Sequence, residues 1–213
     1  MRLCYKTYKN NESPKKALVF IHGWGGNKNS FSPFVSRLKF KTHIEWFLPE
    51  APYDLNEHKI DGIKSTPSKK SWTFKKQNNQ WETEEPMKML DNFFSRVIFN
   101  CYKSENVFVF GFSQGAAICY EHIMGMDVKF GGIFPIAGFF FEKTSRKKVS
   151  IRNRQTPIII GHGINDLIVP IEKSEEAYRK LVGENANVTI EKYNGGHKIN
   201  MKYIKKIIRM IDE

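Results

Sequence analysis

The stretch Gly111-Phe112-Ser113-Gln114-Gly115 follows directly on the apolar run 106–110 and precedes the small and apolar residues 116–120. A G-x-S-x-G pattern between a strand and a helix is typical of a sharp turn that exposes a serine. The two glycines leave room for that turn, and the turn strains the serine backbone. We therefore predict that Ser113 stands above a sheet edge as a nucleophile, beside the N-terminus of the following helix.

Apolar runs of strand length alternate with segments of helical period along nearly the whole chain. This alternation predicts an α/β fold with a mostly parallel central sheet flanked by helices. The expected strands are 2–8 at an edge, then 17–21, 44–48, 106–110, 131–136, 157–160 and 188–193. The expected helices are 30–38, 87–101, 172–182 and 201–211.

Composition limits the class of protein. The 213 residues, 40% of them hydrophobic, fit a single globular domain over 1–213. No apolar run is long enough for stable insertion into a membrane, and the first residues lack the apolar core of a secretory signal, so we expect a cytoplasmic protein. The net charge of +12 is spread over many short lysine runs without a nucleic-acid motif, so no nucleic-acid partner is expected.

The three cysteines, Cys4, Cys101 and Cys119, are odd in number and widely spaced. This spacing argues against a disulfide framework and against a zinc site. Cys101 and Cys119 fall in apolar helical patterns, so both are predicted to be reduced core residues.

One segment breaks the alternation. Residues 52–82 combine prolines, lysines, polar residues and isolated aromatics without a sustained period. Such a long connection in a compact domain is usually functional or mobile. Since it lies between a strand and a long helix, we expect a lid-like insertion or pocket wall near the carboxyl edge of the sheet, in place of a full cap domain. A plain surface loop is the alternative.

A serine nucleophile needs a base, and the base needs an acceptor that orients it. Downstream of Ser113, Asp166 follows the strand 157–160, and His197 follows the strand 188–193 in a glycine-preceded loop. The order serine, acid, histidine is the one expected for this turn. Because parallel strands end at one edge, the three side chains are predicted to meet there as a catalytic triad.

The remaining histidines fit catalysis less well. His22 precedes a glycine-rich loop and is predicted to shape that loop by hydrogen bonding. His162 lies in the same loop as Asp166 and is predicted to be structural. Three more lie on segments unsuited to a nucleophile: His43, His58 and His122.

Acyl transfer places negative charge on the former carbonyl oxygen, and backbone N–H groups must stabilise it. One donor is expected from Gln114, directly after the nucleophile. The other is expected from the loop 22–26, with the N–H of Trp24 as first choice and that of Gly23 as second. A phosphate loop is the alternative for this segment, but the loop lacks the spacing of either common phosphate motif.

Taken together, these motifs resemble those of the α/β-hydrolases, and among them the small phospholipase/carboxylesterase family that includes acyl-protein thioesterases. Beside the acyl pocket, Gly138 and Phe139 loosely match the family's Ser-Gly-aromatic segment. Trp72 is a looser match to its pocket tryptophan. The matching segments are His22-Gly23-x-Gly25, Gly111 to Ala116, His162-Gly163-x-x-Asp166-x-x-Val169-Pro170, and Gly195-Gly196-His197.

The resemblance implies a serine carboxylesterase that hydrolyses small to medium acyl esters through a covalent acyl-enzyme, without metal or cofactor. It also implies substrate contacts from Gly23, Trp72, Phe139 and Ile168. The expected partner is a small-molecule ester, and a homodimer is compatible with the sequence. The alternatives are a thioesterase or C–C bond hydrolase with the same triad, and a non-catalytic binding protein of this fold.

Overall fold

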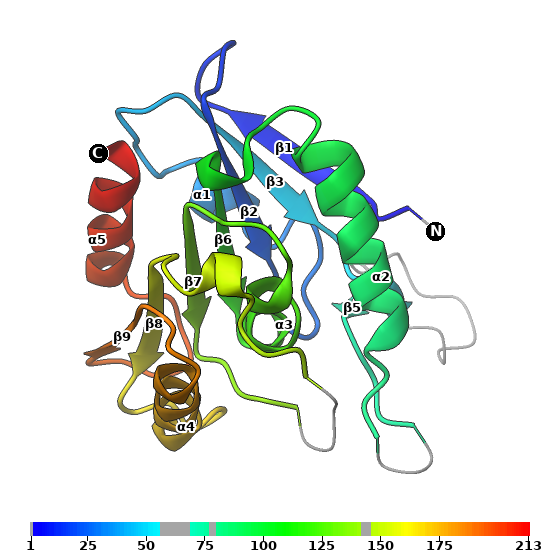
Figure 1. Ribbon diagram of the computed structural model, residues 1–213, viewed down its shortest axis with the longest axis vertical. Coiled ribbons are helices and arrows are strands. Elements are labelled where there is room, and N and C mark those ends of the chain that lie inside the picture. The colour runs from blue at the N-terminus through cyan, green and yellow to red at the C-terminus, as the bar shows by residue number, and fades with distance from the viewer. Residues whose placement is uncertain (1, 56–68, 77–79, 142–145) are drawn as a thin grey trace.

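The computed structural model is built on a seven-stranded sheet with the order β1-β3-β2-β6-β7-β8-β9 (Figure 1). The structure describes residues 2–55, 69–76, 80–141 and 146–213. The first strand pairs antiparallel with β3, and the other neighbours pair in parallel. The strands are β1 (Tyr5–Lys9), β2 (Lys16–Ile21), β3 (Ile44–Pro49), β6 (Val107–Phe112), β7 (Gly132–Ile136), β8 (Ile158–Gly163) and β9 (Val188–Tyr193). The predicted mostly parallel α/β sheet is confirmed.

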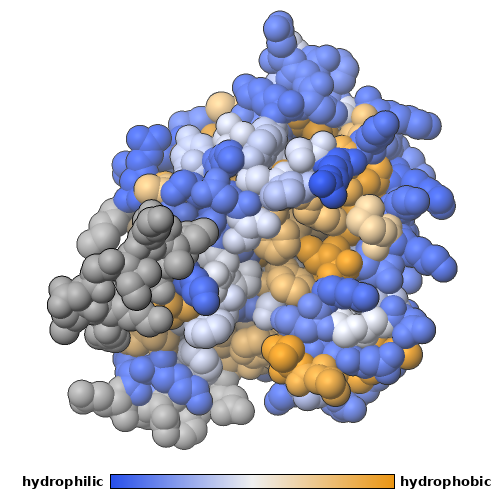
Figure 2. Space-filling model, turned by 180° about the vertical axis from the view of Figure 1, so that it is seen from behind, coloured by the Kyte–Doolittle hydropathy of each residue, from blue (hydrophilic) through white to orange (hydrophobic). Residues whose placement is uncertain are grey.

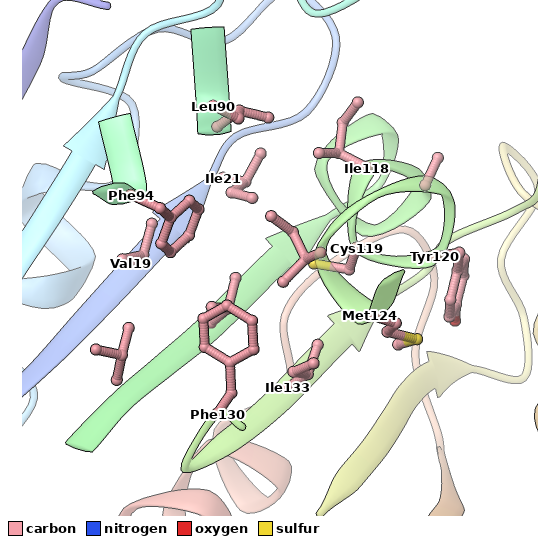
Figure 3. Close-up of a cluster of buried hydrophobic side chains, with 14 of the residues drawn as sticks. Val19, Ile21, Leu90, Phe94, Ile118, Cys119, Tyr120, Met124, Phe130 and Ile133 are labelled. Carbon is pink, nitrogen blue, oxygen red and sulfur yellow. The ribbon is translucent and has the colours of Figure 1, made fainter. Parts of the chain in front are cut away.

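Helices cover both faces of the sheet, which is why the central strands are apolar on both sides. One face carries α2, α3 and α4, and the other carries α1 and α5 (Figure 1). Figure 3 shows part of the first core, where Phe94, Ile118 and Ile133 converge between helices and sheet. The α-helices are α1 (Ser32–Val35), α2 (Glu84–Phe93), α3 (Gln114–Glu121), α4 (Ile171–Gly183) and α5 (Met201–Asp212). Short helices of other types are η1 (Phe94–Ile98), η2 (Ser104–Asn106), η3 (Ile123–Gly125) and η4 (Ile151–Asn153).

Two predicted helices differ from the observed ones. The segment 30–38 is helical only over α1, because side chains before it bond the backbone in turns: Asn27 Oδ1 accepts from Asn29 N at 2.8 Å, and Ser30 Oγ accepts from Asn27 N. The long helix predicted over 87–101 begins at Glu84 and passes into the π-helix η1 after Phe93. Helical periodicity does not distinguish these two helix types over so short a segment.

The cysteines are free thiols, and their burial departs from the prediction at one position. Cys119 is fully buried in α3, as expected. Cys101 is exposed, so its assignment to the core is wrong. It lies in the turn after η1, where the chain has already left the helical face that faces the sheet.

The insertion predicted over 52–82 is described only in part. Its described part includes a small antiparallel pair of β4 (Tyr53–Asp54) and β5 (Lys70–Ser71). Residues 56–68 and 77–79 lie outside the described residues, so the lid remains a prediction.

The surface seen in Figure 2 is mostly hydrophilic, with apolar residues gathered between the charged ones. This agrees with the dispersed lysines of the sequence. Among the described helices, none combines the length and the apolar character needed to cross a bilayer.

Candidate active site

Ser113 lies at the junction of β6 and α3 in a backbone conformation that side chains rarely adopt, with φ of 54° and ψ of −115°. Its N–H donates to the carbonyl of Ile136 at the end of β7, at 2.9 Å. A β-carbon at Gly111 would lie 2.3 Å from the carbonyl oxygen of Gly115, so this turn closes only with glycine at that position. The sharp turn predicted from the sequence is therefore present, with the serine at its apex.

The glycine-rich loop after β2 lies directly beside this turn, because β2 and β6 are neighbouring strands. A β-carbon at Gly23 would lie 3.2 Å from Cβ of Ser113. In the loop, the N–H of Gly25 donates to the carbonyl of Lys70 and that of Gly26 donates to the carbonyl of Gly23. Within the described residues, the N–H of Trp24 donates to no backbone carbonyl, so it is available to a substrate oxygen.

The N–H of Gln114 is the second candidate donor. Gln114 is the first residue of α3, and the first N–H groups of a helix have no partner within the helix. The N–H groups of Ala116 and Ala117 already turn back to the carbonyl of Ser113. Both predicted oxyanion donors, Trp24 and Gln114, thus belong to segments that flank Ser113.

Asp166 and His197 meet across two loops, one after β8 and one after β9. Oδ2 of Asp166 accepts a hydrogen bond from Nδ1 of His197 at 2.7 Å. Oδ1 accepts from the N–H groups of Ile168 and Val169, each at 2.9 Å. Burial alone would raise the pKa of Asp166, but the bonds from Val169, His197 and Ile168 outweigh it and hold the pKa below its ordinary value. The carboxylate is thus ionised at neutral pH.

His197 also lies close to the serine turn. Its ring centre is 4.9 Å from that of Phe112, the residue before Ser113. With Nδ1 bonded to Asp166, Nε2 remains for the serine hydroxyl. In the described part of the chain, Ser113 Oγ makes no hydrogen bond to this nitrogen, and such bonds often tighten only when substrate binds.

His162 has the structural role predicted for it. Its ring is fully buried, with Nε2 donating to the carbonyl of Val169 at 2.8 Å and Nδ1 accepting from Oγ of Ser174 at 2.6 Å. These bonds join the loop of Asp166 to α4. His162 therefore anchors the acidic residue and does not face the serine.

A groove of about 250 Å³ borders the loop of Asp166. It contains two of the residues predicted to bind substrate, Phe139 and Ile168. It is lined by apolar residues and two lysines, namely Lys75, Trp81, Phe139, Phe140, Ile168, Val169, Pro170 and Lys173. Phe139 follows β7 by three residues, so the groove begins close to the strand end that bonds Ser113.

Trp72 does not line this groove. Its side chain is fully buried, and its Nε1 donates to the carbonyl of His22 at 2.9 Å. The substrate contact expected from Trp72 is corrected, because its side chain has no exposed surface with which to touch a ligand. The contacts that Trp72 makes instead were not predictable from the sequence, because no spacing pattern links residue 72 to residues 22 and 114.

Comparison with known proteins identifies the family of the chain. The family model described as "Phospholipase/Carboxylesterase" matches residues 4–213. The chain belongs to this family. It is 27% identical to the "Acyl-protein thioesterase 1" of Debaryomyces hansenii, over 93% of this chain and 91% of that protein. It is 24% identical to the "Carboxylesterase SOBER1" of Arabidopsis thaliana, over 89% of this chain and 86% of that protein.

Among solved structures, a carboxylesterase of Bacillus cereus is similar with a TM-score of 0.74 and 19% identity, covering 99% of this chain and 93% of that one. This likeness shows the α/β-hydrolase fold. The family resemblance inferred from the motifs is confirmed, and the chain is a hydrolase of the esterase and thioesterase class.

Proposed function

We propose that this hydrolase is a serine carboxylesterase for small to medium acyl esters, acting through Ser113, His197 and Asp166. The observation that carries the proposal is the 2.7 Å bond between Asp166 and His197, made beside a serine in a strained strand-to-helix turn. A buried carboxylate that holds Nδ1 of an imidazole leaves Nε2 basic and aimed outward, as a serine base requires.

The chemistry follows in two steps. Ser113 Oγ attacks the carbonyl carbon while Nε2 of His197 takes its proton, and the carbonyl oxygen gains a negative charge between the N–H groups of Trp24 and Gln114. The C–O bond to the alcohol then breaks, and His197 gives its proton to the leaving oxygen. Water repeats the sequence on the acyl-serine, returning Ser113 and releasing the carboxylic acid.

The groove at Phe139 and Ile168 is proposed to hold the acyl chain. A volume of about 250 Å³ is small beside the pockets that enclose drug-sized ligands, so it suits short and medium chains. The apolar side chains that line the groove favour a hydrocarbon chain.

Thioester hydrolysis is the second candidate, because the same steps cleave a C–S bond and the relative from Debaryomyces hansenii is named a thioesterase. A p-nitrophenyl ester series from acetate to palmitate, run beside the matching acyl-thioesters, tests both. We expect the highest kcat/KM for esters of intermediate length. The variant Ser113→Ala is expected to fold yet lose about 10⁴-fold or more in kcat. Retention of a tenth of the activity would exclude Ser113 as nucleophile.

A further inference from the structure

The two proposed oxyanion donors belong to segments far apart in the sequence, the loop after β2 and the start of α3. The distance between the two N–H groups determines where the substrate oxygen that gains negative charge can be bound. We propose that residues 70–73, here named the strap, hold the two segments in register and that Trp72 is the positioning residue at the centre. This inference rests on the proposed function and adds to it residues that touch no substrate.

On one side, the strap holds the glycine-rich loop. Nε1 of Trp72 donates to the carbonyl of His22 at 2.9 Å, just before Gly23. The N–H of Gly25 donates to the carbonyl of Lys70 at 2.9 Å, and the N–H of Lys70 donates to the carbonyl of Gly26 at 3.0 Å. These bonds lie on both sides of Trp24, so its free N–H is fixed from either end.

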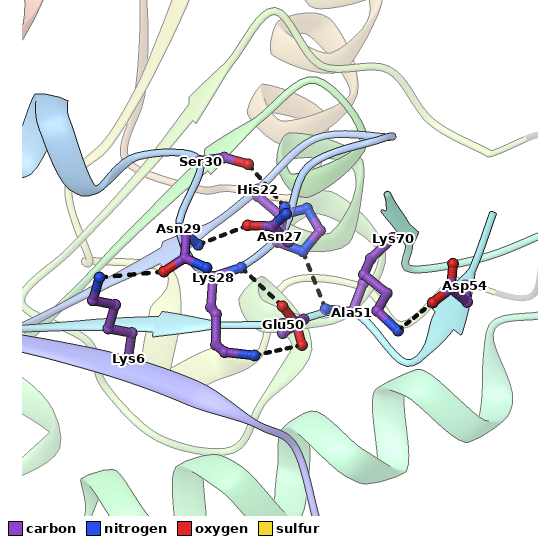
Figure 4. Close-up of polar contacts among 10 residues, drawn as sticks. All are labelled: Lys6, His22, Asn27, Lys28, Asn29, Ser30, Glu50, Ala51, Asp54 and Lys70. Carbon is purple, nitrogen blue, oxygen red and sulfur yellow. Dashed lines mark hydrogen bonds and ion pairs between the residues drawn. The ribbon is translucent and has the colours of Figure 1, made fainter. Parts of the chain in front are cut away.

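The loop is also held from its other face. Nδ1 of His22 donates to the carbonyl of Gly23 at 2.8 Å. Nε2 of His22 accepts from the N–H of Ala51 at 3.1 Å (Figure 4). Lys70 is anchored in turn by its ion pair with Asp54, at 2.9 Å (Figure 4). The strap therefore completes a support in which the loop lies between β3 and the β4–β5 pair.

On the other side, the strap holds the serine turn through the side chain of Gln114. Oε1 of Gln114 accepts from the N–H of Trp72 at 2.9 Å, and Nε2 donates to Oγ of Ser71 at 3.0 Å. Oγ of Ser71 donates onward to the carbonyl of Thr73 at 2.6 Å. Trp72 thus bonds the carbonyl of His22 with its ring and the side chain of Gln114 with its backbone.

Burial makes this arrangement specific. Ser71 and Trp72 are completely buried, and Gln114 is 4% exposed. A buried polar group that loses its hydrogen-bond partner is destabilising, so a shift of the strap that breaks one of these bonds is disfavoured. A misplacement of about 1 Å at a reacting group can cost 10²-fold in rate. A small shift of the loop relative to α3 is therefore expected to affect the transition state far more than substrate binding.

The variant Trp72→Phe tests this, because it keeps an aromatic ring and removes the Nε1 donor, together with part of the indole ring that is fully buried. The matched control is Trp46→Phe, which removes the same ring atoms from a buried tryptophan of β3 that packs against Phe20 and Phe110, in the core cluster on the other side of the sheet from that of Trp72. A second test variant is Ser71→Ala, which removes the partner of Gln114 Nε2. Each is assayed for kcat and KM with the best ester, and for thermal unfolding.

The decisive measurement is the affinity for two ketone inhibitors that carry the same hydrocarbon chain. A trifluoromethyl ketone adds Ser113 Oγ to its carbonyl carbon, and its oxyanion lies between the donors. The methyl ketone binds without adding. For Trp72→Phe we expect kcat to fall about 10- to 100-fold with little change in KM, and the affinity for the trifluoromethyl ketone alone to fall by a similar factor. Trp46→Phe should change neither, and Ser71→Ala should follow Trp72→Phe.

Two results would overturn the proposed role of the strap. One is a kcat of Trp72→Phe that is no lower than that of Trp46→Phe. The other is that Trp72→Phe loses equal affinity for both ketones. If Trp72→Phe does not fold, an unchanged kcat in Ser71→Ala overturns it instead. The proposed function fails separately, when the wild-type chain neither hydrolyses an ester nor binds the trifluoromethyl ketone.

Discussion

The α-carbon of Gly115 lies so close to the carbonyl of Ile21 that an added β-carbon would be 2.1 Å from that oxygen. Both atoms are backbone, at the carboxyl end of β2 and in the first turn of α3. No side-chain rotation relieves such a contact. We therefore expect Gly115→Ala to lose at least about 2 kcal/mol in the free energy of unfolding, as overpacked sites do. It should also lose fluorophosphonate labelling of Ser113, because the serine turn must shift.

The control is Gly183→Ala at the last turn of α4, where a β-carbon meets no atom within 4 Å. Alanine favours a helix over glycine, so this variant should be as stable as the wild type or more so, by about 0.5–1 kcal/mol at most. Urea unfolding of the two variants measures the difference. A Gly115→Ala chain with wild-type stability and labelling would contradict the close approach of α3 to β2.

Asp166→Asn is expected to preserve the fold and remove most of the activity. The amide keeps an oxygen for the N–H groups of Ile168 and Val169, so its nitrogen faces His197. Nδ1 must then accept, the ring proton moves to Nε2, and the serine loses its base. In a serine protease, the corresponding change lowers kcat about 10⁴-fold, and we expect a loss of about 10³ to 10⁴ here.

The measurement is kcat at neutral pH, beside Asp127→Asn, whose side chain is 85% exposed in a surface pair with Arg152. A wild-type rate for Asp166→Asn would exclude this acid. The pKa of Asp166 is lowered in the fold, so its carboxylate stabilises the native state at neutral pH. That contribution is lost as the pH falls below the ordinary aspartate value of about 3.9 and towards the folded pKa.

We expect the buried His22 to make the free energy of unfolding depend on pH, in a higher pH range than Asp166 does. Burial lowers the pKa of its imidazole from 6.5 to about 4, and the carbonyl of Gly23 and the charge of Glu50 offset only part of this. Glu50 is itself paired with Lys28 (Figure 4). Protonation would place a hydrogen on Nε2, where the N–H of Ala51 already points. The folded chain therefore keeps His22 neutral.

The unfolded chain takes up this proton below about pH 6.5, and the folded chain only below about pH 4. Stability due to neutral His22 is thus complete above pH 6.5 and is lost as the pH falls towards 4, by about 3 kcal/mol in total. Urea unfolding between these values should show a shallower slope in His22→Gln, which retains an acceptor for Ala51. The exposed His43→Gln is the control. Equal slopes in wild type and His22→Gln would contradict a buried neutral imidazole.

The parts of the fold that local sequence determines were predictable. Buried parallel strands need apolar residues on both faces, which marks β2 and β6 clearly. Parallel strands also end at one edge, so Asp166 and His197, each placed after a strand, could be predicted to meet although 31 residues separate them. The serine turn was predictable because it leaves no room for a β-carbon at Gly111 and Gly115, and the local sequence has glycine at both positions.

The strap was not predictable by the same means. Its bonds join Trp72 to His22 and Gln114 across 50 and 42 residues, and neither period nor composition encodes such a contact. The segment looks polar and irregular in sequence, which suggested a pocket wall. The exposure of Cys101 was missed for a related reason, since the helical pattern continued past the residue at which the π-helix η1 ends.

The acyl groove provides the last prediction, because Ile168 and Leu167 are neighbours with different surroundings. Ile168 is 71% exposed and lines the groove, whereas Leu167 is 93% exposed and does not. Removing apolar area that a bound chain would cover costs about 25 cal/mol per Å², or about 0.8 kcal/mol per methylene group. Ile168→Ala should therefore lower kcat/KM for octanoate esters by about 3- to 30-fold and leave acetate esters nearly unchanged. Leu167→Ala should alter neither, and both variants should unfold at the wild-type temperature because neither side chain is buried. Equal losses for acetate and octanoate would place the acyl chain outside this groove, and a chain-length effect in Leu167→Ala would place it across the exposed tip of the loop.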